Sequence, residues 1–296
     1  MDHVLTLVAA DGSMEGTAPA RLRSALADLG ADTLSPRWLA RHRAVDLPFS
    51  LLAADQAVAA ARYLLNDLPI DMVAQPAAER RKMLLLADMD STMVIGETLD
   101  ELADFAGLRE EIAAITTRAM NGEIDFTEAF RHRIDRLAGL PTSCLEETLA
   151  RIRLTPGGPT LVATMKAAGA LTVLVSGGIR FFTRAIGQQC GFDRDIGNDI
   201  AIDGGHLTGR VIEPILERRS KGESLKTIAA ERHLPLSQTL AVGDGANDLD
   251  MIEAAGLGVA FHGKPIVAVR APARVDHGDL TTLLFFQGYR EDEFVS

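Results

Sequence analysis

The sequence predicts an α/β protein built on a parallel sheet, and three short, mostly apolar segments carry this prediction. They are residues 83–87, 171–175 and 239–242. Segments of this length and composition are typical of strands that are buried on both faces of a parallel sheet. Each is followed directly by polar residues and glycines. Open α/β sheets hold their chemical groups beyond the carboxyl ends of the strands, so we expect these polar residues to lie together.

The residues that follow these strands form a chemically coherent set. Two acids follow the first strand, a hydroxyl with two glycines follows the second, and two acids with an amide follow the third. A lysine lies between the second and third strands. These residues are Asp88 and Asp90, Ser176, Gly177 and Gly178, Asp244, Asn247 and Asp248, and Lys221. Singly, each has an ordinary interpretation as a glycine turn, a surface lysine or a helix-capping acid. All four elements in this order rarely arise by accident.

This set fits phosphoryl transfer through a covalent intermediate. The carboxylate of Asp88 can attack phosphorus, which divides one difficult displacement into two easier ones. Asp90 can protonate the leaving oxygen and later accept a proton from water. Ser176, with the amides of the glycines beside it, can bind the oxygens of the transferring phosphoryl group, and Lys221 supplies a fixed positive charge on them.

The acids also indicate a divalent cation. Asp88 and Asp244, with a main-chain carbonyl, offer the few oxygen ligands that Mg²⁺ binds alongside water and phosphate. Asn247 and Asp248 can then orient the metal, its waters or the lysine. The competing interpretation of Asp244 and Asp248 as acids in the first turn of a helix is about equally good from their positions alone.

These segments resemble the four motifs of the haloacid-dehalogenase-like (HAD) phosphatases, over about residue 82 to the C-terminus. Glu97 and residues 120–126 and 131–133 resemble in particular the members that act on O-phospho-L-serine. The resemblance implies a Rossmann-like HAD core with a parallel sheet. It implies Asp88 as nucleophile and Asp90 as acid/base; Ser176, Gly177, Lys221 and Asn247 at the phosphate or substrate; Asp88, Asp90 (through its carbonyl) and Asp244 on Mg²⁺; and Asp248 as support for the metal site.

Selection of a phosphoamino acid requires an acid for its ammonium group and a base for its carboxylate. Glu97 can pair with the ammonium group, and Arg133 can bind the carboxylate with its planar guanidinium. Met120 and Phe126 can form an apolar wall around both charge pairs. The resemblance implies the same roles. From the residues alone, Glu97 is also an ordinary first-turn acid, and Arg133 one member of a basic helix face.

We therefore expect a Mg²⁺-dependent phosphatase that hydrolyses O-phospho-L-serine through an aspartyl-phosphate, as the last step of serine biosynthesis. One alternative is a phosphatase or phosphotransferase for another small phosphomonoester. A second alternative, from a different class, is a non-catalytic amino-acid-sensing protein on the same scaffold. The presence of every catalytic position disfavours the second alternative.

Two further regions surround the predicted core at residues 81–296. Residues 1–80 are expected to form a small ferredoxin-like α+β domain with βαββαβ order, similar in topology to ACT-type modules. Its expected elements are strands at 4–10 and 70–74, helices at 19–29 and 53–68, and two short strands within 32–52. This domain is interpreted either as a ligand-binding module or as a structural or dimerising appendage, with a homodimer through it as one outcome. Residues 76–82 would be a polar linker.

An insertion at about 97–155 has helical periodicity in four segments, which are 97–107, 110–121, 125–138 and 142–154. Glycines and a proline follow the successive segments and predict their ends. A four-helix cap beside the strand ends could close over the substrate and exclude water. The residues expected to choose the substrate fall in and around this insertion.

Composition excludes several other functions. The 296 residues are 47% hydrophobic and 24% charged, with a formal net charge of −11, which disfavours nucleic-acid binding. No apolar run has the length that spans a bilayer, and the N-terminus lacks the pattern of a secretory signal. Cys144 and Cys190 lie in unrelated segments and are expected to be buried thiols. A cytoplasmic protein follows as the expectation.

Overall fold

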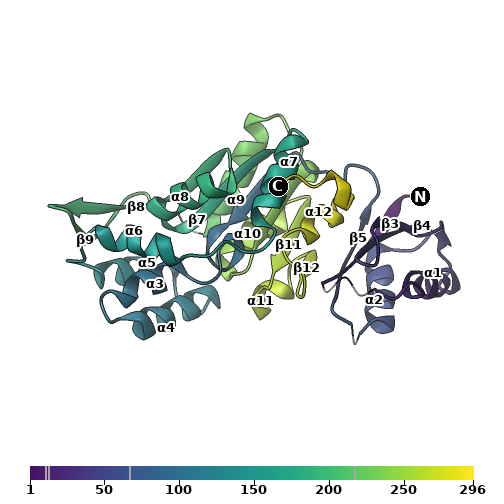
Figure 1. Ribbon diagram of the computed structural model, residues 1–296, viewed down its shortest axis with the longest axis horizontal. Helices are drawn as coiled ribbons and strands as arrows, with labels where there is room; N and C mark the ends of the chain where they lie inside the picture. The colour runs from purple at the N-terminus through teal and green to yellow at the C-terminus, as the bar shows by residue number, and fades with distance from the viewer. Residues whose placement is uncertain (11, 13, 67, 217) are drawn as a thin grey trace.

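The computed structural model describes residues 1–10, 12, 14–66, 68–216 and 218–296. Within them the chain forms one continuous sheet flanked by helices (Figure 1). The strands are β1 (His3–Ala9), β2 (Asp32–Thr33), β3 (Arg37–Ala40), β4 (Ala44–Ser50), β5 (Ile70–Pro76), β6 (Leu84–Asp88), β7 (Leu171–Ile179), β8 (Arg194–Asp203), β9 (His206–Ile212), β10 (Thr239–Gly243), β11 (Leu257–Phe261) and β12 (Ala273–Val275). The helices are α1 (Ala18–Asp28), α2 (Ala54–Leu64), α3 (Thr98–Asp104), α4 (Arg109–Met120), α5 (Phe126–Asp135), α6 (Ser143–Arg151), α7 (Gly158–Ala167), α8 (Arg180–Cys190), α9 (Arg218–Glu231), α10 (Leu249–Ala254), α11 (Pro265–Ala268) and α12 (Thr282–Phe286).

The sheet is mixed and has a parallel centre. Among the described residues its strands follow the order β2-β4-β1-β5-β12-β11-β10-β6-β7-β8-β9, with β3 paired to β4. The pairs from β12 through β11, β10, β6 and β7 to β8 are parallel, whereas the strands of the N-terminal region pair antiparallel. The predicted α/β core is confirmed, and its third strand begins at Thr239 as expected.

Alternation of side chains along the central strands explains how helices cover both faces of the sheet. Leu85 and Ala87 of β6 belong to the hydrophobic cluster that includes residues of α7, α8 and α12. Leu84 and Leu86 belong instead to the cluster that includes residues of α9, α10 and α11. Because successive residues of a strand point to opposite faces, one apolar run supplies both clusters. This double burial accounts for the absence of polar residues within the run.

Helices α3 to α6 occupy the stretch of chain after β6 in which four helical segments were expected. They cover residues 98–104, 109–120, 126–135 and 143–151; α4 is as long as its expected segment and is displaced by one residue, whereas the other three are shorter than expected. Figure 1 shows α3, α4 and α5 at the end of the molecule where β8 and β9 lie. The link is direct, because Gly139 donates a backbone hydrogen bond to Leu207 of β9, and Leu207 donates one to Leu140. The β8–β9 hairpin therefore supports the far side of this helical segment.

The N-terminal region has one strand more than expected. Residues 32–52 form three strands, and the basic stretch Arg41 to Arg43 is the turn between β3 and β4. His42 in this turn has a φ of 62°, a left-handed conformation suited to a tight connection. The second helix ends at Leu64 rather than at the expected residue 68, and residue 67 lies outside the described part.

The N-terminal region is joined to the core through the sheet itself. β5 pairs with β12 at the position where Met72 lies opposite Arg274. Beside this pair, the buried carboxylate of Asp71 accepts backbone hydrogen bonds from Asp276 and Gly278 at 2.7 Å each, and from His277 at 3.2 Å. These bonds satisfy amides of a loop that belongs to the core.

The segment expected to be a polar linker is anchored at two residues. Arg80 donates to the carboxylate of Asp46 at 2.7 Å and to the hydroxyl of Thr6 at 2.8 Å, inside a largely buried contact. Lys82 is buried and donates to the carbonyls of Glu79 and Ser237. The connection is therefore polar in sequence, as expected, but is held by both parts of the chain.

Two expectations about composition are tested by the fold. Cys144 and Cys190 are both buried and unpaired, as expected. Burial raises the pKa of the Cys190 thiol to about 11, so this group stays protonated near neutral pH. In the part of the chain that the structure describes, no helix has both the length and the apolar character needed to cross a membrane.

Candidate active site

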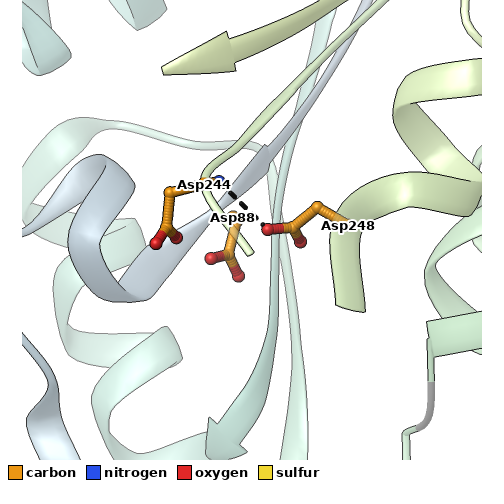
Figure 2. Close-up of side chains that lie close together, drawn as sticks. All are labelled: Asp88, Asp244 and Asp248. Carbon is orange, nitrogen blue, oxygen red and sulfur yellow. Dashed lines mark hydrogen bonds between the residues drawn. The ribbon is translucent and has the colours of Figure 1, made fainter. Parts of the chain in front are cut away.

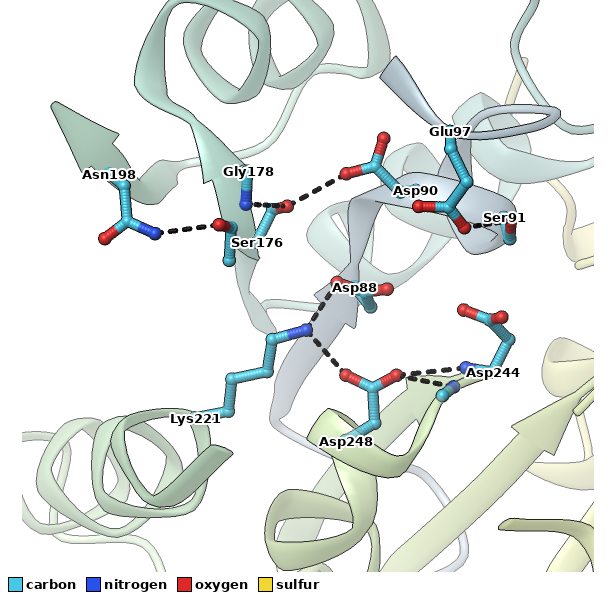
Figure 3. Close-up of polar contacts among 12 residues, drawn as sticks. Asp88, Asp90, Ser91, Glu97, Ser176, Gly178, Asn198, Lys221, Asp244 and Asp248 are labelled. Atoms are coloured by element: carbon cyan, nitrogen blue, oxygen red, sulfur yellow. Dashed lines mark hydrogen bonds and ion pairs between the residues drawn. The ribbon is translucent and has the colours of Figure 1, made fainter. Parts of the chain in front are cut away.

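The three polar segments predicted to meet do lie together at one edge of the sheet. β6 pairs in parallel with β10 on one side and with β7 on the other, so the carboxyl ends of all three strands are adjacent. Figure 3 shows the polar side chains that gather there. Hydrogen bonds link them in two groups: Lys221 joins Asp88 to Asp248, and Ser176 donates to Asp90. The sequence-based grouping of these residues is thus what the fold produces.

Lys221 is fully buried between two carboxylates. Its Nζ lies 2.5 Å from Oδ1 of Asp88 and 2.6 Å from Oδ1 of Asp248. Although burial lowers the pKa of Lys221, the carboxylates of Asp248 and Asp88 outweigh it and raise this pKa above its usual value. The second oxygen of Asp248 accepts the backbone amides of Asp244 and Gly245. Asp248 therefore has both oxygens occupied by protein donors.

This arrangement requires a glycine at the end of β10. A Cβ on Gly243 would lie 2.4 Å from the carboxylate carbon of Asp248, far inside contact distance. The close approach lets the carboxylate of Asp248 reach both the amides and Lys221. The glycine next to the acid of the third segment is thus explained by packing.

Three carboxylates form the candidate cation site (Figure 2). One oxygen of each of Asp88, Asp244 and Asp248 lies within 4.8 Å of the others. Burial, together with the negative charge of Asp248, raises the pKa of Asp88 well above its usual value, against the lowering effect of Lys221. Burial likewise raises the pKa of Asp244 to about 6. The site therefore contains more negative charge than its lysines balance, which favours a bound proton or a cation.

The chain turns sharply after β6 at residues 89–93. Ser91 has a φ of 56°, and its amide donates to the carbonyl of Gly96. This turn places Asp90 so that Oδ1 accepts the amide of Thr98 at 2.7 Å and Oδ2 accepts the hydroxyl of Ser176 at 3.1 Å. The hydroxyl oxygen of Ser176 in turn accepts the amide of Gly178 at 2.9 Å. Asp90 and the β7 segment are thus fixed relative to each other.

Glu97 and Arg133 approach the same point from the helical segment. Ser91 donates to Oε1 of Glu97 at 2.7 Å. Burial, with Asp90 and Asp244 nearby, raises the pKa of Glu97 to about 8. Arg133 is only 2% exposed, and it donates to the carbonyl of Ala129 and to the hydroxyl of Thr116. Burial lowers the pKa of Arg133 while Glu97 opposes this effect.

A small cavity of about 20 Å³ lies among these groups. That volume holds about one water molecule, so the polar groups surround a space much smaller than a substrate. A wider cleft of about 480 Å³ leads away from it, and both share Phe126 and Asn247. The predicted residues that line the small cavity are Asp88, Asp90, Glu97, Met120, Phe126, Arg133, Ser176, Gly177 and Asn247. Of the predicted set, Lys221, Asp244 and Asp248 lie outside this lining and contact it through Asp88 and one another.

Two buried or half-buried residues of the network were not found from the sequence. Asn198 at the end of the β8 ladder donates to the carbonyl of Gly177 at 2.8 Å and accepts the amide of Leu216. Lys264, after β11, donates from Nζ to Oδ2 of Asp244 at 2.5 Å. A lysine just beyond a fourth parallel strand is the signal that would have identified the second residue. Asn198 lies inside a strand segment and carries no such signal.

Substitution of Gly177 by alanine is expected to lower kcat/KM about tenfold, because misplaced groups lose catalytic alignment. An added Cβ would lie 2.2 Å from Cζ of Phe126, so the ring and the helical segment would have to move outward. The measurement is kcat/KM in a cycle of Gly177→Ala, Phe126→Leu and the double variant. In the Phe126→Leu background, Gly177→Ala should lower kcat/KM less, because leucine leaves more room for the added Cβ. Equal losses from Gly177→Ala in both backgrounds would contradict this explanation.

The chain is similar to known proteins over this region. Residues 85–253 match the family model described as haloacid dehalogenase-like hydrolase. A phosphoserine phosphatase from Streptomyces coelicolor is 42% identical over 224 residues, which are 76% of this chain and 55% of that protein. This chain thus spans about half the length of that relative.

Two solved structures are also similar. A HAD family hydrolase from Salmonella enterica serovar Typhi superposes with a TM-score of 0.83 at 28% identity, covering 98% of this chain and 99% of that one. A phosphoserine phosphatase with a phospho-aspartyl intermediate analogue has a TM-score of 0.66 at 38% identity, covering 69% and 98%. The chain belongs to the haloacid dehalogenase-like hydrolases. Within that family, it is similar to the phosphoserine phosphatases.

Proposed function

We propose that this chain is a Mg²⁺-dependent phosphatase that hydrolyses O-phospho-L-serine through an aspartyl-phosphate, in serine biosynthesis. One observation carries the proposal. A lysine-held carboxylate at the end of β6 faces the same small cavity as a carboxyl group, Glu97, and a guanidinium, Arg133. Phosphate chemistry and amino-acid recognition are thereby combined in one small space. The family membership and the phospho-aspartyl analogue in a similar protein support the same reaction.

In the first step, a carboxylate oxygen of Asp88 forms a bond to phosphorus as the bond from phosphorus to the seryl oxygen breaks. Asp90, in its protonated form, gives its proton to that oxygen and L-serine leaves. In the second step, Asp90 takes a proton from water as the water oxygen attacks the phosphoryl group. Inorganic phosphate leaves and Asp88 is restored. The hydrogen bonds from Thr98 and Ser176 would hold Asp90 in place through both steps.

The phosphoryl oxygens would be bound from three sides. Ser176 and the amide of Gly177 lie at the end of β7, and Lys221 approaches from α9. Because Lys221 is buried and keeps its charge, it offers a preorganised cation where negative charge develops. Asn247 lines the cavity, where its amide nitrogen would donate to the substrate. Its buried Oδ1 accepts no hydrogen bond from the described residues and, as an acceptor, would suit the ammonium group rather than the phosphoryl oxygens.

The residues at the acidic cluster fit Mg²⁺. Among the described residues, Oδ2 of Asp88 and Oδ1 of Asp244 accept no hydrogen bond, whereas both oxygens of Asp248 do. Asp88, Asp244 and the carbonyl of Asp90 would therefore hold the ion, with Asp248 supporting them from behind. When bound, Mg²⁺ would neutralise negative charge on the phosphoryl oxygens and the two carboxylates.

Glu97 and Arg133 would choose the substrate. An ammonium group beside Glu97 would stabilise its carboxylate form, which burial alone disfavours. Arg133 is held through Nε to Ala129 and Nη1 to Thr116, which leaves Nη2 and the second N–H of Nη1 for a planar carboxylate. Met120 and Phe126 would complete an apolar wall that excludes water from both pairs.

We also propose the domain division. Residues 1–80 would form a ferredoxin-like, ACT-like domain, which the strand order β2-β4-β1-β5 and helices α1 and α2 support. Residues 81–296 would form the phosphatase domain, with α3 to α6 at about 97–155 as its cap. Homodimerisation through the N-terminal domain and a cytoplasmic location remain predictions from the sequence.

The proposed function is tested by phosphate release from O-phospho-L-serine, phosphothreonine and an aryl phosphate, with Mg²⁺ and with EDTA. We expect a strong preference for phosphoserine and loss of activity in EDTA that excess Mg²⁺ restores. Release from the aryl phosphate alone would support the phosphatase reaction and reject phosphoserine as the substrate. Absence of release from all three would favour the non-catalytic alternative, and unchanged activity in EDTA would discard the metal.

A further inference from the structure

Lys264 contacts one residue, Asp244, from both its main chain and its side chain. Its amide donates to the carbonyl of Asp244 at 2.9 Å, and its Nζ donates to Oδ2 of Asp244 at 2.5 Å. The next residue is Pro265, which restricts Lys264 to an extended conformation, and the observed ψ is 152°. The backbone at Lys264 is therefore fixed where the side chain reaches the carboxylate.

The segment that carries Lys264 is itself held in place. The amide of His262 donates to the carbonyl of Val275 at 2.8 Å, and the Nε2 of His262 is 3.0 Å from the carbonyl of Gly278. Gly263 permits the tight turn, because a Cβ there would lie 2.9 Å from the Cβ of Ala260. Lys264 thus belongs to a rigid turn.

The contact divides the two oxygens of Asp244. Oδ2 is occupied by Lys264, whereas Oδ1 accepts no hydrogen bond from any described residue. The carboxylate is 5% exposed and lies beside that of Asp88 (Figure 2). Without Lys264, nothing in the described network would distinguish the two oxygens or stop the carboxylate from rotating.

Lys264 does not face the substrate cavity. It is absent from the lining of the small cavity, and instead lines a separate cavity of about 580 Å³ that also contacts Ile95, Phe261 and His277. Its charge is also felt at Glu97, but among the described residues its Nζ donates a hydrogen bond only to Asp244. Its geometric effect on the reaction therefore passes through Asp244.

We propose that Lys264 is a positioning residue that holds Oδ2 of Asp244 and thereby directs Oδ1 at the divalent cation. The inference rests on the proposed role of Asp244 as a metal ligand. Two effects of Lys264 oppose each other, because its hydrogen bond orients the ligand while its charge repels a cation. Hydrogen-bonding partners of metal ligands commonly change metal affinity by about 10- to 100-fold when removed. Orientation should therefore outweigh repulsion.

The experiment measures Mn²⁺ binding to metal-free protein by the EPR signal of free Mn²⁺, and Mg²⁺ binding by competition. Lys264→Met, which removes donor and charge, should weaken binding about tenfold. Lys264→Gln, which keeps an N–H donor without the charge, should stay nearer the wild-type affinity. At saturating Mg²⁺, kcat of both variants should recover, which separates ligand orientation from damage to the catalytic groups.

Lys166→Met is the matched control, since Lys166 forms an ion pair at 2.8 Å with Asp193, which lies at the amino-terminal ends of β7 and β8 rather than at their carboxyl ends. Its metal affinity should equal that of the wild type, and thermal unfolding without metal reports whether each variant is folded. Unchanged or tighter binding in Lys264→Met would overturn the proposal, as would equal weakening in Lys264→Gln. Lack of binding by the wild type would instead reject the proposed metal site itself.

Discussion

Replacement of Asp88 by asparagine is expected to reduce phosphate release from O-phospho-L-serine by at least about 10⁴-fold, the scale of losses when a nucleophile is removed. Asparagine has nearly the same shape, so the contact with Lys221 keeps an acceptor. It cannot form the aspartyl-phosphate, because an amide is a poor nucleophile towards phosphorus. The measurement is turnover under saturating substrate and Mg²⁺, combined with acid quenching and mass analysis of the peptide that contains residue 88.

The control for this variant is Asp203→Asn, at an exposed position of the β8–β9 hairpin. It removes one carboxylate from the surface and should leave turnover unchanged. The wild-type peptide should carry one phosphoryl group after quenching, and the Asp88→Asn peptide none. Activity within a few-fold of the wild type in Asp88→Asn would exclude the covalent mechanism. Loss of the thermal unfolding transition would show that the variant tests folding rather than chemistry.

Removal of Arg133 is the second large effect. Arg133→Ala should raise KM for phosphoserine by about 10²-fold, since loss of one partner of a buried charged pair costs several kcal/mol. The same variant should change kcat/KM for an aryl phosphate by no more than about threefold, because that substrate has no carboxylate for Arg133 to bind. The measurement is the ratio of kcat/KM for the two substrates in each protein.

Arg136→Ala is the matched control, since Arg136 follows α5 directly and pairs with Glu111 on the surface at 2.9 Å. Its ratio should equal that of the wild type. The buried position of Arg133 makes some loss of stability expected, because Glu97 and Asp100 would lose a nearby positive charge. Assays are therefore run well below the unfolding midpoint of each variant. Equal losses on both substrates in Arg133→Ala would contradict carboxylate recognition.

The core of the site could be predicted because its determinants are local. Each catalytic segment is a buried apolar strand followed at once by its polar residues, so position along the chain specifies position in the sheet. β6 lies between β7 and β10, and this neighbourhood brings Asp88, Ser176 and Asp244 together. Strands that alternate with helices along a chain commonly pair in parallel within one sheet.

The residues that were missed depend on contacts between distant segments. Lys264 reaches Asp244 only through the turn after β11, and Asn198 reaches Gly177 across β7 and β8. For Asn198, neither residue type nor spacing reveals the contact, and for Lys264 the one signal is its place just after a fourth strand. β12 has three residues, too few for a periodic pattern, and so the join between β5 and β12 was not expected. Tertiary partners, rather than propensity, determine these features.

The join between β5 and β12 affects where this chain can be cut. A break between residues 77 and 80 would put Arg80 and Asp46 on different fragments. Removal of residues 1–80 would take away the acceptor that Asp71 provides for three core amides. It would also uncover Phe286, whose carbonyl accepts Gln75 at 2.6 Å. The two regions therefore meet through buried contacts rather than through an exposed linker. In truncation or domain exchange, a fragment that begins near residue 81 would carry a new apolar surface.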